Sequence, residues 1–157
     1  MDRSHVAGKF YEDWEIGDEY ETAATTVTEA HLIKYAYLTG YYNPLNMDAE
    51  YAKSSIFGER VAPGFLVHSM STGQVNQTRL FEGTTIAFLG IKYLNFVRPV
   101  KIGDTIKTLG KLIEKRETKK AGRAIVIFKA TVVNQKGEPV TESERAILVR
   151  MGSENKR

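Results

Sequence analysis

The spacing of hydrophobic and polar residues divides the chain into an early part with helical periodicity and a later part that is strand-like. A first short strand is predicted at residues 19–27, which are rich in β-branched and aromatic side chains and roughly alternate. Apolar residues at helical spacing then predict helices at residues 28–39, 48–55 and 63–80. Apolar or alternating runs predict long strands at residues 86–97, 105–116, 124–133 and 140–151. Strands gathered after helices indicate an α+β fold, with an antiparallel sheet wrapped around one helix.

The predicted elements begin and end at residues suited to those positions. Thr28 is a suitable N-cap for the first helix, and Gly40 suits a left-handed C-cap. The buried face expected for this helix comprises Leu32, Ile33, Ala36 and Tyr37. Pro63 suits the first position of the long helix. Residues 134–137, Asn-Gln-Lys-Gly, predict a hairpin loop with Gly137 in its left-handed position.

The chain is predicted to form one domain. Residues 86–97 are apolar on both faces, as expected of a central strand covered on both sides. We expect residues 1–18 to be a lead-in that packs onto the domain, because Trp14 and its neighbours are too apolar for a free tail. The domain then covers residues 19–151, and residues 152–157 form a polar tail.

Composition narrows the class of protein. The 157 residues are 42% hydrophobic and 26% charged, which fits one compact soluble domain. The longest apolar runs are too short to span a membrane, and the first residues lack the apolar core of a secretory signal, so we expect a cytoplasmic protein. The absence of cysteine excludes disulfides, a thiolate nucleophile and cysteine-ligated metal, and we expect no metal and no cofactor. A formal charge of +3 does not by itself suggest nucleic-acid binding.

Residues 39–48 form the most distinctive stretch, a polar loop between two predicted helices. Gly40 ends the helix before it, and Asn43-Pro44 turns the chain, because the ring of a proline pushes the preceding residue out of helical space. Asp48 is expected to cap the next helix. A rigid polar loop of this kind is well placed to present side chains to a ligand.

Three segments together carry a resemblance to a known family. Residues 40–48 read Gly-Tyr-Tyr-Asn-Pro-Leu-Asn-Met-Asp, residues 60–65 read Arg-Val-Ala-Pro-Gly-Phe, and residues 96–105 read Phe-Val-Arg-Pro-Val-Lys-Ile-Gly-Asp-Thr. In this order the segments resemble the signatures of the MaoC-like dehydratases, the (R)-specific enoyl-CoA hydratases of the hot-dog fold. The resemblance covers about residues 20–151 and implies a single hot-dog fold.

The resemblance also implies a site whose acid–base pair has changed. In the hydratases, an Asp and a His of the loop activate the water that adds across the double bond of an enoyl thioester. Tyr41 stands at the Asp position and Asn46 at the His position. A phenol titrates near ~10 and an amide does not titrate, so neither is a base near neutral pH. We expect a rearranged catalytic set of Tyr41, Asn46, Gly64 and His68.

Other residues match the substrate-binding part of the family's site. The family binds the thioester carbonyl with a backbone N–H at the start of the central helix, where this chain has Gly64 after Pro63. Thr72 matches a Ser that faces the site two turns along the helix. Asn43 completes the expected binding set, together with Pro63, Gly64 and Thr72.

Each of these residues also has a simpler interpretation. Asn43 shapes the turn before Pro44 in most such loops. His68 is the best remaining base near the loop, but a lone histidine is more commonly just packed or hydrogen-bonded. The basic residues of the second half form either a solvated sheet edge or a rim for the phosphates of coenzyme A. These residues are Lys101, Lys107, Lys111, Lys115, Arg116, Lys119, Lys120 and Arg123.

Three functions are consistent with the sequence. The first, which we favour because the rest of the site matches the family, is an enzyme, an acyl-CoA hydratase or dehydratase (a hydro-lyase) of fatty-acid metabolism that acts on 2-enoyl-CoA or 3-hydroxyacyl-CoA thioesters with Tyr41 and Asn46 in place of the usual pair. The second is a non-catalytic protein that binds acyl thioesters, as a sensor or as the inactive partner of an active subunit. The third, an acyl-CoA thioesterase, ranks last because it requires a carboxylate near Gly64. The resemblance further implies a homodimer or higher homo-oligomer, and we expect no nucleic-acid or membrane partner.

Overall fold

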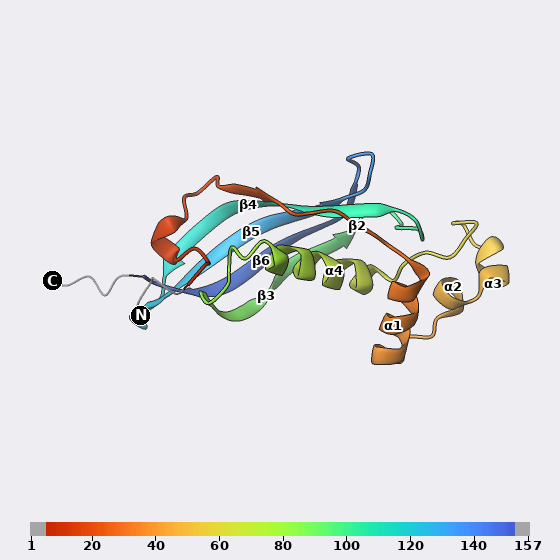
Figure 1. Cartoon of the computed structure of the whole chain (residues 1–157), viewed down its shortest axis with the longest axis horizontal. Helices are drawn as coiled ribbons and strands as arrows, with labels where there is room; N and C mark the ends of the chain where they lie inside the picture. Colours follow the sequence, from red (N-terminus) through yellow and green to blue (C-terminus); the bar gives the residue numbers. More distant parts are fainter. Residues whose placement is uncertain (1–5, 153–157) are drawn as a thin grey trace.

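One antiparallel sheet dominates the structure, a computed structural model that describes residues 6–152 (Figure 1). The first five and last five residues, which include parts of the expected lead-in and tail, lie outside the described residues. The long strands are β3 (Thr85–Phe96), β4 (Thr105–Glu117), β5 (Arg123–Val133) and β6 (Pro139–Arg150). Two short strands, β1 (Glu19–Glu21) and β2 (Thr25–Thr26), both pair with β4. The strand order is β1-β4-β5-β6-β3, with every pair antiparallel.

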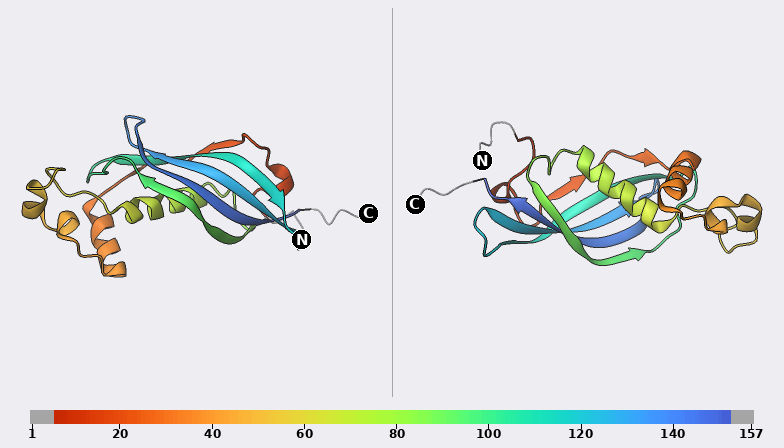
Figure 2. Two further views of the ribbon diagram at one scale, coloured as in Figure 1. Left: turned by 180° about the vertical axis from the view of Figure 1, so that it is seen from behind. Right: turned by 90° about the horizontal axis from the view of Figure 1, so that it is seen from below.

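The helices occupy two places relative to this sheet. Helix α4 (Gly64–Gln77) runs along its inner face, which the view from below shows most clearly (Figure 2). Three shorter helices gather beyond one end of the sheet: α1 (Glu29–Thr39), α2 (Pro44–Met47) and α3 (Ala49–Lys53). A 3-10 turn, η2 (Tyr11–Asp13), packs against β5. The predicted α+β arrangement, a sheet wrapped around one helix, is therefore confirmed.

The core lies between α4 and the inner face of the sheet. Strand β5 supplies its centre through alternate buried side chains, namely Ala124, Val126, Phe128, Ala130 and Val132. At one end, the buried Trp14 ring stacks on Phe81 at 5.3 Å and meets Phe128 edge-on at 5.0 Å. Burial of large aromatic side chains accounts for much of the stability of such a layer.

The ends of α1 follow the sequence prediction, but its buried face is narrower than predicted. Gly40 ends the helix in the left-handed region at φ 74°, and the Thr28 backbone N–H donates to His31 Nδ1 at the N-terminus. Leu32 and Ala36 are buried, whereas Ile33 and Tyr37 of the predicted face are exposed. The helix projects beyond the sheet, so the core covers only one narrow stripe of it.

Three boundaries differ from the prediction. The single strand expected at residues 19–27 is split into β1 and β2, because Thr22 turns its hydroxyl to accept the Thr108 backbone N–H. Asn43-Pro44 opens a one-turn helix, α2, where only a turn was expected. Helix α4 begins at Gly64, with Pro63 as its N-cap residue, and ends at Gln77, three residues before Leu80.

Strand β3 is an edge strand, so the prediction of a central strand at residues 86–97 is wrong. It pairs only with β6, and its other edge has no partner strand among the described residues. Its large apolar side chains, Phe88, Leu89 and Phe96, remain about half exposed. A strand with two apolar faces and a free edge is typical of a surface that another chain covers.

Candidate functional site

The loop between α1 and α3 is held by its own polar side chains. Asn43 Oδ1 accepts the Leu45 backbone N–H at 3.0 Å, which caps α2. Asp48 Oδ1 accepts the N–H groups of Glu50 and Tyr51 at 2.9 and 3.0 Å, which caps α3. A side-chain oxygen at these positions satisfies backbone donors that a helix leaves unpaired. The structural role expected for Asp48 is therefore present, and Asn43 acts as a cap while it also faces a cavity.

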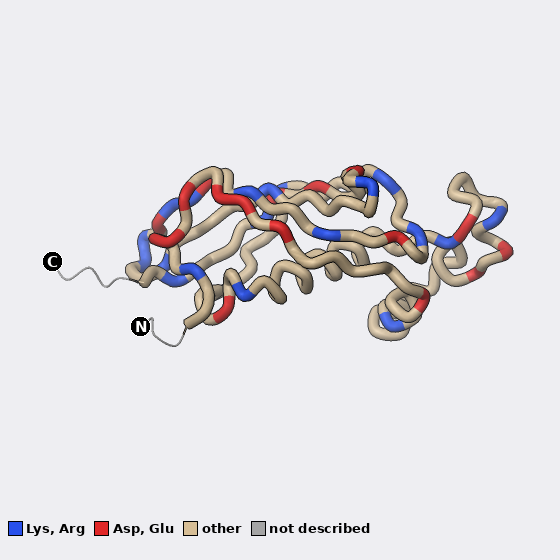
Figure 3. The backbone as a smooth tube through the Cα atoms, turned by 45° about the horizontal axis from the view of Figure 1, so that its top comes forward, with Lys and Arg blue, Asp and Glu red and all other residues tan. Residues whose placement is uncertain are grey.

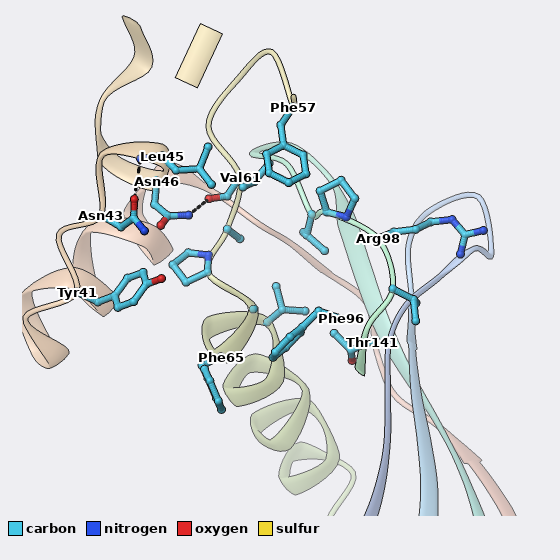
Figure 4. A pocket seen from close by; sticks show the side chains of 17 residues that line it. Tyr41, Asn43, Leu45, Asn46, Phe57, Val61, Phe65, Phe96, Arg98 and Thr141 are labelled. Carbon is cyan, nitrogen blue, oxygen red and sulfur yellow. Dashed lines mark hydrogen bonds between the residues drawn. The ribbon is translucent and has the colours of Figure 1, made fainter. Parts of the chain in front are cut away.

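Asn46 is the buried polar residue of the loop. Its side chain is only 4% exposed, and its Nδ2 donates to the Val61 carbonyl at 2.6 Å (Figure 4). This bond ties α2 to the segment that leads into α4. Because an amide has both a donor and an acceptor, Asn46 keeps Oδ1 available for a further hydrogen bond.

A cavity of about 550 Å³ opens between the loop and the start of α4, and we call it the loop–helix cleft. Tyr41, Asn43, Asn46, Pro63 and Gly64 all line it, so the structure brings five of the predicted site residues together. The Tyr41 hydroxyl points toward the segment that leads into α4 (Figure 4). Tyr41 is 45% exposed, and its ring meets that of Tyr35 edge-on at 6.2 Å.

The first turn of α4 faces this cleft with unpaired backbone donors. The first N–H groups of a helix have no acceptor within it, and no side chain of residues 6–152 caps α4. Phe96 packs closely over Gly64, where a Cβ would lie 2.6 Å from the Phe96 ring. Only glycine permits this approach. Such a helix start is a natural place for an oxygen that carries negative charge.

Sequence reasoning missed Thr141 as a residue of the cleft. This side chain on β6 is 2% exposed and lines the cleft, and its hydroxyl has no hydrogen-bond partner among the described residues. A buried hydroxyl without a partner is costly, which suits a position where a ligand or a water supplies the bond. The signal available in the sequence was a lone Thr in the last strand, which is too common to be informative.

His68 and Thr72, although predicted for the site, do not line the cleft. His68 is 8% exposed, and its Nδ1 has no hydrogen-bond partner among the described residues. Burial, with a smaller effect from the charge of Arg145, lowers the His68 pKa to about 4, so its ring is neutral near pH 7. Thr72 lies two turns along α4 beside a separate groove, and its hydroxyl donates to the Ser69 carbonyl at 2.7 Å.

Half of the eight basic residues singled out on the second half of the chain have acidic partners, and Arg116 with Glu114 is one of these pairs. Lys101 pairs with Glu59, Lys107 with Glu21 and Lys111 with Glu19, all on exposed surface. Basic and acidic positions are interspersed along the strands rather than separated (Figure 3). These pairs support the solvated-edge interpretation over a continuous basic rim.

Arg98 is the one cation that lines the loop–helix cleft within residues 6–152. Its side chain is exposed, and its Nη1 donates to the Pro139 carbonyl at 2.8 Å. Among the described residues, no cluster of three or more His, Cys, Asp or Glu could hold a metal ion. Nor is any helix in that part of the chain long and apolar enough to cross a membrane.

Comparison with a family model and with a curated protein gives the same family. Residues 12–134 match the model of the MaoC-like domain. Protein MaoC of Klebsiella aerogenes is 37% identical over 123 residues, which is 78% of this chain and 36% of that protein. The chain therefore spans about a third of the length of this curated relative.

Solved structures are similar over nearly the whole chain. A monoamine oxidase regulatory protein from Archaeoglobus fulgidus is 38% identical, with a TM-score of 0.87 over 93% of this chain and 97% of that one. An R-hydratase from Pseudomonas aeruginosa is 31% identical, with a TM-score of 0.77 over 93% of this chain and 88% of that one. A Mycobacterium tuberculosis protein with a double hot-dog fold, at 19% identity and a TM-score of 0.83, shares the fold. The hot-dog fold predicted from the sequence is confirmed.

Proposed function

The chain belongs to the MaoC-like domain family, and from this premise we propose that it binds an acyl-CoA thioester in the loop–helix cleft. The observation that carries the proposal is the start of α4, where unpaired backbone N–H groups face a cavity lined by Gly64 and Asn46. A helix start stabilises an oxygen that carries partial negative charge, such as the carbonyl of a thioester. The Gly64 N–H is the donor we assign to that carbonyl.

The substrate class we propose is 2-enoyl-CoA or 3-hydroxyacyl-CoA, as for a hydratase or dehydratase. Similarity to an R-hydratase over most of both chains supports this class. The cleft is also suitable, because its lining is mainly apolar around a few polar groups. The lining contains no carboxylate within the described residues, so thioester hydrolysis has no support here.

Binding is better supported than turnover. Tyr41 and Arg98 are the ionisable side chains of the cleft lining in the described part of the chain, and neither is a base near neutral pH. Asn46 Oδ1 and the Tyr41 hydroxyl could hold a water, but neither would take its proton. We therefore favour an acyl-thioester-binding role without the usual acid–base pair. Hydration with Tyr41 and Asn46 is the second candidate, favoured by the likeness to the R-hydratase.

One experiment separates these two functions. The purified chain is titrated with crotonyl-CoA and with longer enoyl-CoAs in a calorimeter, while loss of the enoyl-thioester absorbance reports hydration. Saturable binding without hydration above the uncatalysed rate is the expected result. Hydration that saturates with substrate would establish the second candidate. Failure of every acyl-CoA to bind would refute both.

Arg98 is the residue we assign to the phosphates of coenzyme A. It lies at the exposed side of the cleft, and it has no carboxylate partner among the described ion pairs. A guanidinium is suited to phosphate because its planar donors match two phosphate oxygens.

We also propose a homodimer formed through β3. The free edge of this strand and its half-exposed Phe88 and Leu89 offer hydrogen bonds and apolar surface to the β3 of a second copy. Sedimentation of the native chain should give a dimer. Leu89→Lys places a charge at the edge and should shift the equilibrium toward the monomer, whereas a monomeric native chain would contradict this proposal.

A further inference from the structure

Phe57, in the connection between α3 and α4, is an aromatic side chain on the lining of the loop–helix cleft. It is partly buried, yet it belongs to neither hydrophobic cluster of the described core. Within residues 6–152 its ring also meets no other aromatic ring. Core packing therefore does not account for this side chain, which presents apolar surface to the cleft.

Local hydrogen bonds fix the position of Phe57. The Ser55 carbonyl accepts the Gly58 backbone N–H at 3.1 Å, and the Ser55 hydroxyl oxygen accepts the Phe57 backbone N–H at 3.2 Å. Gly58 completes this turn in the left-handed region at φ 70°. The same hydroxyl donates to the Ala52 carbonyl at 2.7 Å, which ties the turn to α3. An aromatic ring on such a turn is pre-organised for a ligand, since its backbone has little freedom left to lose on binding.

Arg98 lies on the same side of the cleft as Phe57, across from Tyr41 and Asn43 (Figure 4). It forms no ion pair with a carboxylate in the described part of the chain, and its Nη1 donates to the Pro139 carbonyl. One aromatic ring and one free guanidinium therefore flank this side of the cleft. Together they suit a nucleotide, because a base stacks on an aromatic face and a phosphate accepts hydrogen bonds from a guanidinium.

The other basic residues in and beside the α3–α4 connection have carboxylate partners. The pairs are Lys53 with Glu50 at 2.6 Å, Arg60 with Glu29 at 2.8 Å and Lys101 with Glu59 at 2.6 Å. An acidic carrier protein would dock through a broad surface of complementary, positive charge. These pairs leave no run of free positive charge in this part of the described chain, so the cleft entrance suits a single nucleotide better than a carrier protein.

We infer that Phe57 and Arg98 bind the adenosine 3′-phosphate of coenzyme A, and that they make the chain selective for coenzyme A thioesters over thioesters of an acyl carrier protein. The adenine stacks on the Phe57 ring, and Arg98 donates to the 3′-phosphate. The pantetheine arm connects this nucleotide with the thioester carbonyl at the Gly64 N–H. The inference rests on the proposed function and adds the part of the ligand that the thioester site does not contact.

Calorimetry with three crotonyl thioesters tests the inference on the full chain. Crotonyl-CoA should bind about 10- to 100-fold more tightly than crotonyl-pantetheine, because base stacking and charged hydrogen bonds add that much affinity. The crotonyl thioester of an acyl carrier protein should bind no more tightly than crotonyl-pantetheine. Equal affinities for crotonyl-CoA and crotonyl-pantetheine, or a carrier-protein thioester that binds as tightly as crotonyl-CoA, would overturn the inference and leave the proposed function intact. Failure of all three to bind would refute the proposed function, and this inference with it.

Two variants of Phe57 and one control locate the adenine. Phe57→Ala should weaken crotonyl-CoA about tenfold and leave crotonyl-pantetheine unchanged, so that the preference for coenzyme A falls. Phe57→Trp should keep the preference, because an indole ring also offers a face for stacking. Tyr51→Ala removes an exposed aromatic residue of α3 that does not line the cleft, and it should change neither affinity. An unchanged preference in Phe57→Ala, or an equal loss of both thioesters, would exclude stacking on Phe57.

The 3′-phosphate gives a separate test of Arg98. The native chain should bind crotonyl-3′-dephospho-CoA about tenfold more weakly than crotonyl-CoA, whereas Arg98→Met should bind the two equally. A preference that persists in Arg98→Met would exclude Arg98 as the phosphate ligand. Circular dichroism and thermal unfolding show whether each variant is folded. If a variant does not fold, the comparison of thioesters on the native chain still decides.

Discussion

The replaced acid–base pair gives the most direct test of the proposed site. If the rest of the loop–helix cleft is intact, Tyr41→Asp combined with Asn46→His should create hydratase activity on crotonyl-CoA. Both positions line the cleft, beside the backbone donors at the start of α4. A histidine at position 46 can still donate a ring N–H toward the Val61 carbonyl, which now accepts from Asn46 at 2.6 Å.

The double variant should have two effects, a loss of stability and a gain in hydration rate, and the structure sets the size of each. The larger ring of a buried histidine overpacks the site and costs about 1–2 kcal/mol. Loss of the Tyr41–Tyr35 ring contact costs about 1 kcal/mol. A total of about 2–3 kcal/mol lowers the Tm of a domain of this size by about 4–12 °C, which leaves the protein folded. General acid–base catalysis contributes about 10²- to 10⁴-fold, so hydration should rise by that factor over the native chain.

The assay follows the enoyl-thioester absorbance at several pH values, with binding measured in parallel. The rate should fall at acidic pH as the introduced histidine becomes protonated, below its ordinary pKa of ~6.5, because position 46 is buried and burial lowers the pKa of an imidazole. Tyr42→Asp with Asn46→His is the matched control, because Tyr42 contacts Tyr37 and does not line the cleft. Equal rates for the two double variants, with acyl-CoA binding retained by both, would refute the assignment of the site.

Three further predictions concern His68, Gly110 and Arg98. The lowered pKa of His68 means that its contribution to stability is fully present above pH ~6.5 and is lost as pH falls toward about 4. Between about pH 7.5 and pH 5, the free energy of unfolding measured with urea should therefore fall by about 2 kcal/mol more for the native chain than for His68→Gln. Equal decreases in the two proteins would contradict the burial of a neutral ring. Gly110→Ala should destabilise the chain by about 1–3 kcal/mol in the same assay, because the added Cβ would collide with the Tyr20 ring. Gly73→Ala on α4 is the control, and it should be neutral or stabilising by up to about 1 kcal/mol, because its Cβ would meet nothing within 4 Å. Arg98→Met should weaken coenzyme A binding about tenfold at low salt and reduce its salt dependence; unchanged calorimetric affinity would remove Arg98 from the phosphate site.

The sequence was most informative where local chemistry decides the structure. Gly40 ends α1 and Gly137 takes the left-handed position of the hairpin, because only local backbone geometry is involved. The motif residues Tyr41, Asn46 and Gly64 meet in one cleft, since the motifs fix both the loop and the start of the helix. These are positions at which sequence pattern and tertiary structure impose the same requirement.

Strand β3 is a place where the sequence pattern does not determine the position of the strand in the sheet. Apolar residues on both faces indicate that something covers the strand, but they do not say whether its own chain or a second copy does so. Within the described chain β3 lies at the edge of the sheet. The same ambiguity explains why the buried face predicted for α1 is too wide, since Ile33 and Tyr37 are apolar yet exposed.

The sequence did not predict the burial of the inner face of β6, because its residues are polar. Thr141, Ser143 and Arg145 alternate along the strand and are polar, which is the pattern of a solvated face, yet all are buried. Their burial depends on polar residues of α4, and the sequence does not reveal that pairing between distant segments. A usable signal was the helix itself, because Ser71 and Gln74 are unusual on a helix predicted to be enclosed by a sheet.

This buried polar layer also explains how α4 is held in position for the cleft. Ser71 Oγ accepts from Arg145 at 2.7 Å, and the Thr108 hydroxyl lies 2.9 Å from both Ser71 Oγ and Gln74 Oε1. Gln74 Nε2 in turn donates to the Ile106 carbonyl at 2.8 Å. Apolar contacts tolerate sliding, whereas these directional bonds fit only one register of the helix against β4 and β6. Since α4 is a single rigid element, the bonds that fix its middle also fix its first turn, and with it the backbone donors that face the thioester.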